Sequence, residues 1–213
     1  EYNKMKSILK AQNVTILFVR GNHDDPSFFN GANKIDFKYL KTIPDYSILS
    51  FNDSNVLCIG GAISIDRKQR KDKEFKIFSQ LKKYTKKVEY PRFYWENEMP
   101  VFSKDILDEI NGDNILIDTV ITHTSPSFAP LNNKDNIEMF IAFDPKLEYD
   151  LVAERKIMDQ IYTCLIKEHG HPIKNWYYGH FHRHDMYYSD DDVKFIMLDM
   201  CRLKNNSWDI RPI

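Results

Sequence analysis

Apolar and polar positions alternate along the chain with two different periods, which predicts a mixture of helices and strands. Residues 2–12, 102–110 and 148–168 repeat apolar side chains at helical spacing, with Ser103 as an N-cap and Gly170 just past the last helix. Shorter apolar runs between turn-forming residues predict strands. These strands lie at residues 14–19, 46–51, 56–61, 117–123, 185–189 and 193–200, and residues 175–182 are a strand that runs into a loop. Because strands and helices are interspersed, we expect an α/β architecture.

The strand at residues 14–19 is apolar almost throughout, so we expect it to be buried in a parallel or mixed sheet. The strands at 46–51 and 56–61 are separated only by turn-forming residues. Residues 185–189 and 193–200 are expected to pair as a hairpin through three aspartates.

Length and composition describe an ordinary globular protein. The 213 residues are 42% hydrophobic and 29% charged, which suits one domain spanning residues 1–213. No apolar run approaches the roughly 18–20 residues of a membrane span, and no signal-peptide core is present. Cys58, Cys164 and Cys201 are far apart and predict neither a disulfide framework nor a zinc-type cysteine pair. We therefore expect a reducing, cytoplasmic setting.

Charge is unevenly distributed, although the net charge is only −1. Residues 67–87 contain ten Lys or Arg and two Asp or Glu. We favour a solvated, mobile insertion here, because charge runs commonly face solvent. The alternative is a surface that attracts phosphate-rich ligands or nucleic acid.

Polar side chains follow three of the predicted strands at the point where each strand ends. Asn22 and His23 follow residues 14–19, His123 ends another strand, and His180 and His182 follow a third. Ligand sites in α/β sheets lie outside the carboxyl ends of strands, so these groups can converge on one cleft. Imidazole is a common ligand of transition metals, and an amide oxygen suits Mn, Mg or Fe. A histidine there can also act as a general acid or stabilise a phosphoryl oxygen.

These motifs resemble those of the calcineurin-like metallophosphoesterases. The resemblance rests on "GNHD" at 21–24, the histidine of "ITH" at 123 and "GHFH" at 179–182, and it spans almost the whole chain. The segments "GGAISIDRKQR", "YWENE" and "THTSPSFAP" are similar to a bacterial and phage branch of that family. In that branch a strand rich in small residues leads to a Ser-x-Asp…Arg segment and then to an aromatic-Trp-x-x-Glu segment near the cleft. The resemblance implies a four-layer sandwich, in which two mixed sheets face each other with helices outside.

The resemblance also implies an active site with two divalent metal ions, of which Mn is favoured over Fe, Zn or Mg. Asn22, His123 and His180 would bind one ion, and His182 would bind the other. His23 would protonate the leaving oxygen or neutralise charge on phosphorus. Asp24 would orient the loop or His23, and Arg70 and Arg67 are candidate substrate contacts. Arg70 is favoured by its spacing from Asp66.

Two motifs of the family are absent from this sequence. No Asp-x-His occurs, and the one Gly-Asp, Gly112-Asp113, follows a predicted helix and is interpreted as a helix-ending turn. The carboxylate expected to bridge the two metals is therefore missing. We expect the first strand–helix units and both motifs to lie upstream of Glu1, so that the 213 residues alone have weak activity or none. A degenerate binding scaffold and a site completed by a second chain are the alternatives.

The function predicted from these residues is metal-dependent hydrolysis of phosphate mono- or diesters. The basic stretch and the aromatic residues weakly favour a nucleotide or nucleic acid as substrate. A serine/threonine protein phosphatase and a non-catalytic scaffold are the alternatives. The remaining histidines at 169 and 171 follow a long helix, where a cationic imidazole is favourable, so we interpret them as structural.

Overall fold

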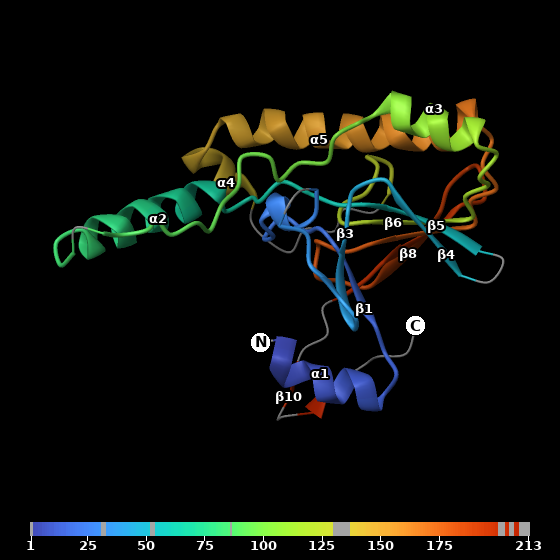
Figure 1. The fold of residues 1–213 in the computed structure, drawn as a ribbon. Helices are drawn as coiled ribbons and strands as arrows, with labels where there is room; N and C mark the ends of the chain where they lie inside the picture. Colours follow the sequence, from blue (N-terminus) through green and yellow to red (C-terminus); the bar gives the residue numbers. More distant parts are fainter. Residues whose placement is uncertain are drawn as a thin grey trace.

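The chain folds into two main β-sheets with helices around them (Figure 1). The computed structural model describes residues 2–30, 33–51, 54–85, 87–129, 137–199, 203–204 and 207–208. Its α-helices are α1 (Tyr2–Ala11), α2 (Arg67–Leu81), α3 (Lys104–Gly112), α4 (Ile137–Phe143) and α5 (Lys146–Tyr162). A short 3-10 helix η1 (Pro26–Phe28) and a π-helical segment η2 (Thr163–Glu168) complete the helical elements of this described part.

The larger sheet is mixed and has the strand order β4-β5-β6-β7-β9-β8. Its strands are β4 (Ser47–Phe51), β5 (Ser54–Ile59), β6 (Thr119–Thr122), β7 (Asn175–Tyr178), β8 (Asp185–Tyr188) and β9 (Lys194–Met197). The four central strands are parallel, and the edge strands β4 and β8 are antiparallel to their neighbours. The carboxyl ends of the central strands therefore meet along one edge of the sheet.

The smaller sheet is also mixed and has the order β1-β3-β2. Its strands are β1 (Ile16–Val19), β2 (Asp36–Phe37) and β3 (Leu40–Ile43). β1 runs parallel to β3, and β2 runs antiparallel to it. A separate antiparallel ribbon joins β10 (Leu203–Lys204) to β11 (Ser207–Trp208).

Alternate residues of β5 show how the layers are held together. Leu57 and Ile59 are almost fully buried in the main core, which is shared with the helices above the sheet. The helical partners are Leu107, Ile110, Met158, Ile161 and Leu165. Val56 and Cys58 belong instead to a second cluster with Ile43 of β3, between the two sheets. Successive side chains of a strand point to opposite faces, so β5 contributes to both cores.

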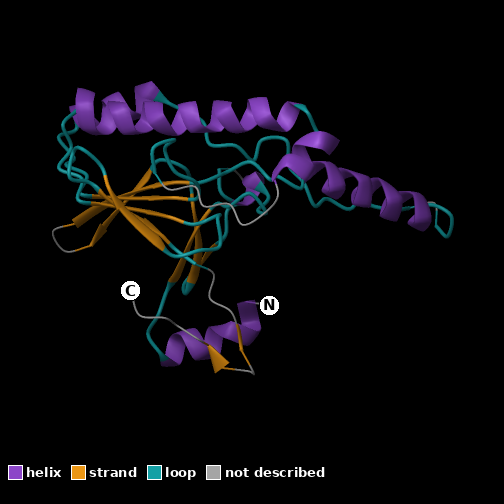
Figure 2. Cartoon of the chain, turned by 180° about the vertical axis from the view of Figure 1, so that it is seen from behind, coloured by secondary structure: helices purple, strands orange, loops and turns teal. Residues whose placement is uncertain are grey.

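These clusters produce a layered sandwich. Figures 1 and 2 show α3 and α5 covering the outer face of the larger sheet, while the smaller sheet lies on the other face. Helix α1 lies beyond the smaller sheet, where the ring of Tyr2 stacks on Phe37 of β2 with centroids 4.3 Å apart. The predicted α/β sandwich of two mixed sheets is confirmed.

Most of the predicted elements form, with two local differences. The prediction that the strand at 14–19 is buried is wrong, because β1 is an edge strand of the smaller sheet and Phe18 is 46% exposed. Ser103 does precede α3, but its hydroxyl makes no capping hydrogen bond. Gly112 and Asp113 end α3, as the interpretation of a helix-ending turn requires.

The basic segment differs most from its prediction. In place of a mobile insertion, Arg67–Leu81 form the helix α2, which projects away from the sheets (Figure 1). The Lys, Arg, Gln and Glu residues of α2 have high helix propensity. The helix has no apolar stripe, so the spacing of apolar residues did not predict it. The segment is solvated, as expected: Phe75 is 66% exposed and Tyr84 is 86% exposed. In the part of the chain that is described, no helix is long and apolar enough to cross a bilayer.

Candidate metal centre

Three of the predicted metal ligands come together where strands from both sheets end. Asn22 lies three residues beyond β1 of the smaller sheet, and His123 and His180 follow β6 and β7 of the larger sheet. The Nε2 atom of His123 lies 3.0 Å from Oδ1 of Asn22. The rings of His123 and His180 meet edge to face, with centroids 5.1 Å apart. The site thus lies at the carboxyl ends of the strands, as predicted.

Glycines allow this close approach. A Cβ atom on Gly21 would lie 3.1 Å from Cε1 of His123, so the backbone of the "GNHD" loop is packed against that imidazole. Asp24 Oδ2 accepts the Gly21 amide proton at 2.7 Å, which supports the role of Asp24 in orienting the loop. From the other side, the Gly179 amide donates to the carbonyl of His123 at 3.2 Å.

The "GHFH" loop has an unusual backbone. Both His180 and His182 have positive φ angles, of 69° and 53°. Non-glycine residues rarely adopt this conformation, and it persists only where surrounding structure enforces it, often at functional sites. The buried Phe181 between them supplies that enforcement, because it packs beneath the guanidinium of Arg155, 5.1 Å from its ring centroid.

The two half-buried imidazoles of the cleft are neutral at physiological pH. Desolvation lowers the pKa of His123 to about 4, and desolvation and the neighbouring His123 hold the pKa of His180 well below its ordinary value. His182 contributes to the lowering of both pKa values, which places it within electrostatic reach of the pair. Neutral imidazole is the form that binds metal.

His23 is exposed at the mouth of the cleft and contacts Arg70. Its Nε2 lies 2.8 Å from Nη2 of Arg70. A guanidinium can only donate, so this nitrogen of His23 accepts, and the proton of the neutral ring lies on Nδ1. Partial burial and the charge of Arg70 lower the pKa of His23 accordingly. Arg70 is itself held by Asp66 at 2.6 Å and by the carbonyl of Phe93 at 3.2 Å.

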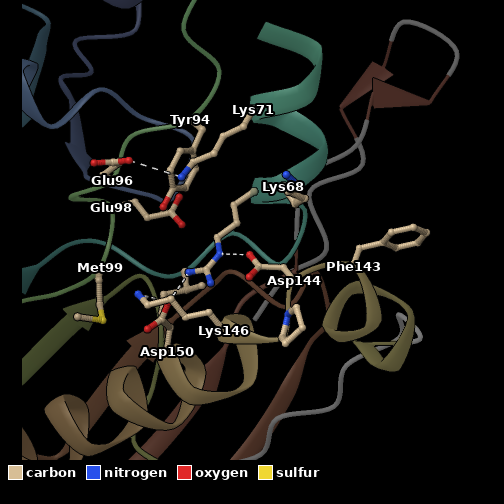
Figure 3. Close-up of a pocket in the computed structure, with 13 residues that line it drawn as sticks. Lys68, Lys71, Tyr94, Glu96, Glu98, Met99, Phe143, Asp144, Lys146 and Asp150 are labelled. Carbon is tan, nitrogen blue, oxygen red and sulfur yellow. Dashed lines mark hydrogen bonds and ion pairs between the residues drawn. The ribbon is translucent and has the colours of Figure 1, made fainter. Parts of the chain in front are cut away.

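Arg67 lies on the same helix but points elsewhere. Its guanidinium donates to Asp144 at 2.6 Å and to Asp150 at 2.7 Å. These groups line a cavity of about 620 Å³. Figure 3 shows Tyr94 and Glu98 on one side of the cavity and the two aspartates on the other. Arg67 therefore has structural partners, and its contact with substrate stays a prediction.

Two buried residues outside the predicted ligand set fix the orientation of Asn22. Its Nδ2 donates to Ser64 Oγ at 2.9 Å, so Oδ1 is directed at His123. Ser64 in turn donates its hydroxyl and its backbone amide to the two carboxylate oxygens of Glu98, both at 2.7 Å. Glu98 is 1% exposed, and burial raises its pKa to about 7.

Glu154 and Arg155 in the middle of α5 brace the loops around the cleft, and burial raises the pKa of the Glu154 carboxyl above its ordinary value. Glu154 is fully buried and accepts from the Ile63 amide and, at 2.9 Å, from the Thr124 hydroxyl. Arg155 donates to the carbonyl of Ser125 at 2.6 Å. In the sequence, this brace is an acidic residue followed directly by a basic one, between the apolar positions of a long helix. The pair was not among the residues predicted to belong to the site.

The donor set is consistent with a divalent metal ion. An amide oxygen and two neutral imidazoles lie together here. The Nε2–H of His123 donates to Asn22 Oδ1, and Nε2 offers a lone pair to a metal in the tautomer that carries its proton on Nδ1. Within the described residues, no three His, Cys, Asp or Glu side chains gather tightly at this cleft. The donors described here therefore form part of a candidate metal site.

Comparison with known proteins agrees with this geometry. The family model for calcineurin-like phosphoesterases matches residues 1–197. The chain matches no curated protein. Because the match covers most of the chain and includes every residue of the cleft, the protein belongs to the calcineurin-like phosphoesterase family.

Proposed function

We propose that the protein hydrolyses phosphoesters with two divalent metal ions. Family membership supports a metal-dependent phosphoesterase in general. The observation that carries the proposal is the convergence of Asn22, His123 and His180 at the strand ends. In the proposed site these three residues hold one ion and His182 holds the other, with Mn favoured. When bound, such ions activate water and neutralise charge on the phosphoryl group.

The residues of the chain have separate tasks in this proposal. Arg70 presents a planar fork to the phosphoryl oxygens and keeps the Nε2 of His23 as an acceptor. The proton on Nδ1 of His23 is then the one available to the leaving oxygen. Asp24 fixes the loop that carries His23, and Arg67 contacts outer parts of the substrate from its position beside the cavity.

The nature of the substrate follows from what surrounds the cleft. The basic helix α2 carries Arg70 at its base and exposed aromatic rings further along, which supports a nucleotide or nucleic acid as the phosphoester. Nothing in the geometry selects between a monoester and a diester. A serine/threonine protein phosphatase remains an alternative of the same chemical class.

The test uses protein expressed from its complete reading frame. We expect Mn-dependent hydrolysis of an aryl phosphate, a bis-aryl phosphate or both. His23→Ala should reduce turnover by roughly 10²–10⁴-fold while metal content stays close to that of the parent. His184→Ala, at an exposed histidine outside the proposed site, is the control and should be active.

Two results would overturn parts of this proposal. Full turnover by His23→Ala contradicts the proton-donor role. Metal binding without hydrolysis of either ester would support the non-catalytic scaffold instead.

A further inference from the structure

We infer that a second, cysteine-containing metal site lies outside the cleft, where α3 meets η2. Asp108 of α3, Cys164 of η2 and His169 just beyond it place one ligand atom each within 4.8 Å of one another. Cys164 lies nine residues beyond Arg155, which braces the loop after His123. At about 1.5 Å per helical residue, the second site is roughly 13 Å further along the helix than that brace. Figure 1 shows α3 beside the far end of α5.

The distances between the ligand atoms suit a tetrahedral ion. Nε2 of His169 lies 2.9 Å from Oδ1 of Asp108 and 3.8 Å from Sγ of Cys164. Ligands at the usual zinc distances are separated by about 3.3 Å for nitrogen and oxygen and about 3.6 Å for nitrogen and sulfur. For these two pairs, shifts of a few tenths of an ångström admit the ion, and the third pair, Asp108 and Cys164, lies within 4.8 Å. Thiolate, imidazole and carboxylate together select Zn²⁺ or a similar soft divalent ion, unlike the harder amide–imidazole set of the cleft.

The π-helical segment brings two of the ligands together. The His169 amide donates to the carbonyl of Cys164 at 3.0 Å, five residues earlier, so the two side chains lie on the same side of a widened turn. In an α-helix residues five apart diverge around the axis. Isolated π-helical turns are rare and are found frequently at functional sites.

A nearby buried histidine independently indicates a ligand. His171 is 4% exposed, and neither of its ring nitrogens has a hydrogen-bond partner in the described part of the chain. Its ring stands perpendicular to that of His169, with centroids 5.9 Å apart. A buried polar group without a partner is costly. His171 is thus the candidate for the fourth ligand of the ion. The alternative fourth ligand is a water molecule on the exposed side of Asp108.

The existing ion pairs are compatible with metal binding. Lys104 contacts Asp108 at 3.0 Å and Glu168 at 2.9 Å, so it keeps a carboxylate partner when Asp108 turns to the ion. The thiol of Cys164 releases its proton to solvent on binding, so affinity rises with pH. The bound ion joins α3 to the end of α5 and stabilises the folded state by mass action.

The probe is Co²⁺, because a cobalt–thiolate bond gives a charge-transfer absorption that the cleft, with its nitrogen and oxygen donors, lacks. Reduced, metal-free protein from the complete reading frame is titrated with Co²⁺, and Zn²⁺ is then added. We expect a band whose final amplitude corresponds to about one cobalt–thiolate centre per chain, with any further Co²⁺ bound at the cleft adding nothing to it, and Zn²⁺ should remove the band. Cys164→Ser should lose the band. Cys58→Ser, which removes a buried cysteine of the sheet, and Asn22→Ala at the cleft should keep it.

Two further variants keep the thiol in place. Asp108→Asn and His169→Gln should weaken Co²⁺ binding by roughly tenfold or more, and circular dichroism shows whether each is folded. The inference is overturned if the parent shows no band, if Cys164→Ser keeps it, or if Cys201→Ser removes it instead. None of these measurements depends on hydrolysis. The inferred second metal site can therefore be refuted while the proposed hydrolytic function holds, and the proposed function can be refuted while the second site holds.

Discussion

Replacing Glu98 by glutamine tests whether this carboxyl is held neutral behind the metal ligands. Both carboxylate oxygens of Glu98 accept from Ser64, and the side chain is otherwise enclosed. Burial raises the pKa of Glu98 from 4.5 to about 7. The desolvation penalty on the charged form therefore exceeds the benefit of its two hydrogen bonds.

The sign of the pH effect follows from linkage. Between pH 4.5 and about 7 the folded protein holds a proton on Glu98 that the unfolded chain has lost, so this group's contribution to stability falls as pH rises. A shift of this size corresponds to about 3 kcal/mol across that window. The glutamine side chain of the variant does not titrate, so the stability of the parent minus that of Glu98→Gln should fall by about 3 kcal/mol from about pH 4 to about pH 8.

Urea unfolding followed by tryptophan fluorescence, in the presence of a chelator and at several pH values, measures this difference. The control is Glu96→Gln, two residues away, whose carboxylate is 87% exposed and lies 3.5 Å from Lys71. Its difference curve should be nearly flat, because exposed ion pairs contribute little. A flat curve for Glu98→Gln, or one that rises with pH, would refute the conclusion that Glu98 is neutral at the lower pH values.

Three further predictions concern the brace, a glycine and the basic helix. Arg155→Met should destabilise the fold by roughly 2–4 kcal/mol in urea, because the buried Glu154 carboxyl and the carbonyl of Ser125 both lose a polar partner. Gly61→Ala should lower the free energy of unfolding by roughly 2–4 kcal/mol, since φ is +95° and a Cβ would lie 2.4 Å from a carbonyl oxygen. The control is Gly112→Ala, whose Cβ would meet no atom within 4 Å, and its free energy of unfolding should stay within about 1 kcal/mol of the parent. The double variant Lys76→Glu with Lys83→Glu should hydrolyse a polynucleotide more weakly, and this hydrolysis should depend less on salt concentration. Its hydrolysis of a bis-aryl phosphate should be unaffected. An equal loss of activity on both esters would contradict a substrate role for α2.

The parts of the fold that could be predicted are those encoded locally. Residues 148–168 repeat apolar side chains at helical spacing, and they form α5 and η2. The strand ends could also be predicted, because an apolar run followed at once by His123, or by Gly179 and His180, marks the place where a strand leaves the core. Parallel pairing of β6 with β7 then brings those histidines side by side.

What could not be predicted depends on contacts that are distant in sequence. The serine that holds Asn22 is 42 residues away from it, and Glu98 is a further 34 residues on. No local pattern distinguishes such a glutamate from a solvated one. The family resemblance placed the segments of Ser64 and Glu98 near the cleft, but not the hydrogen bonds that link them to Asn22. The burial of β1 was wrongly predicted for the same reason, because an apolar run does not reveal how many neighbouring strands will cover it. Helix α2 is held at its base by Arg67 and Arg70, not by an apolar stripe.

The arrangement of the cleft explains why its supports are polar and buried. Asn22 must present its oxygen and not its nitrogen, and the hydrogen bond from its Nδ2 to Ser64 enforces that choice. A single guanidinium, that of Arg155, holds the loop after His123 and packs on Phe181 between the two strained histidines. Apolar residues of similar size would pack as well and cost less desolvation, but they could not direct a carbonyl or an amide. The fold thus gives up stability to fix the direction of its donor atoms, which is the requirement of a metal site.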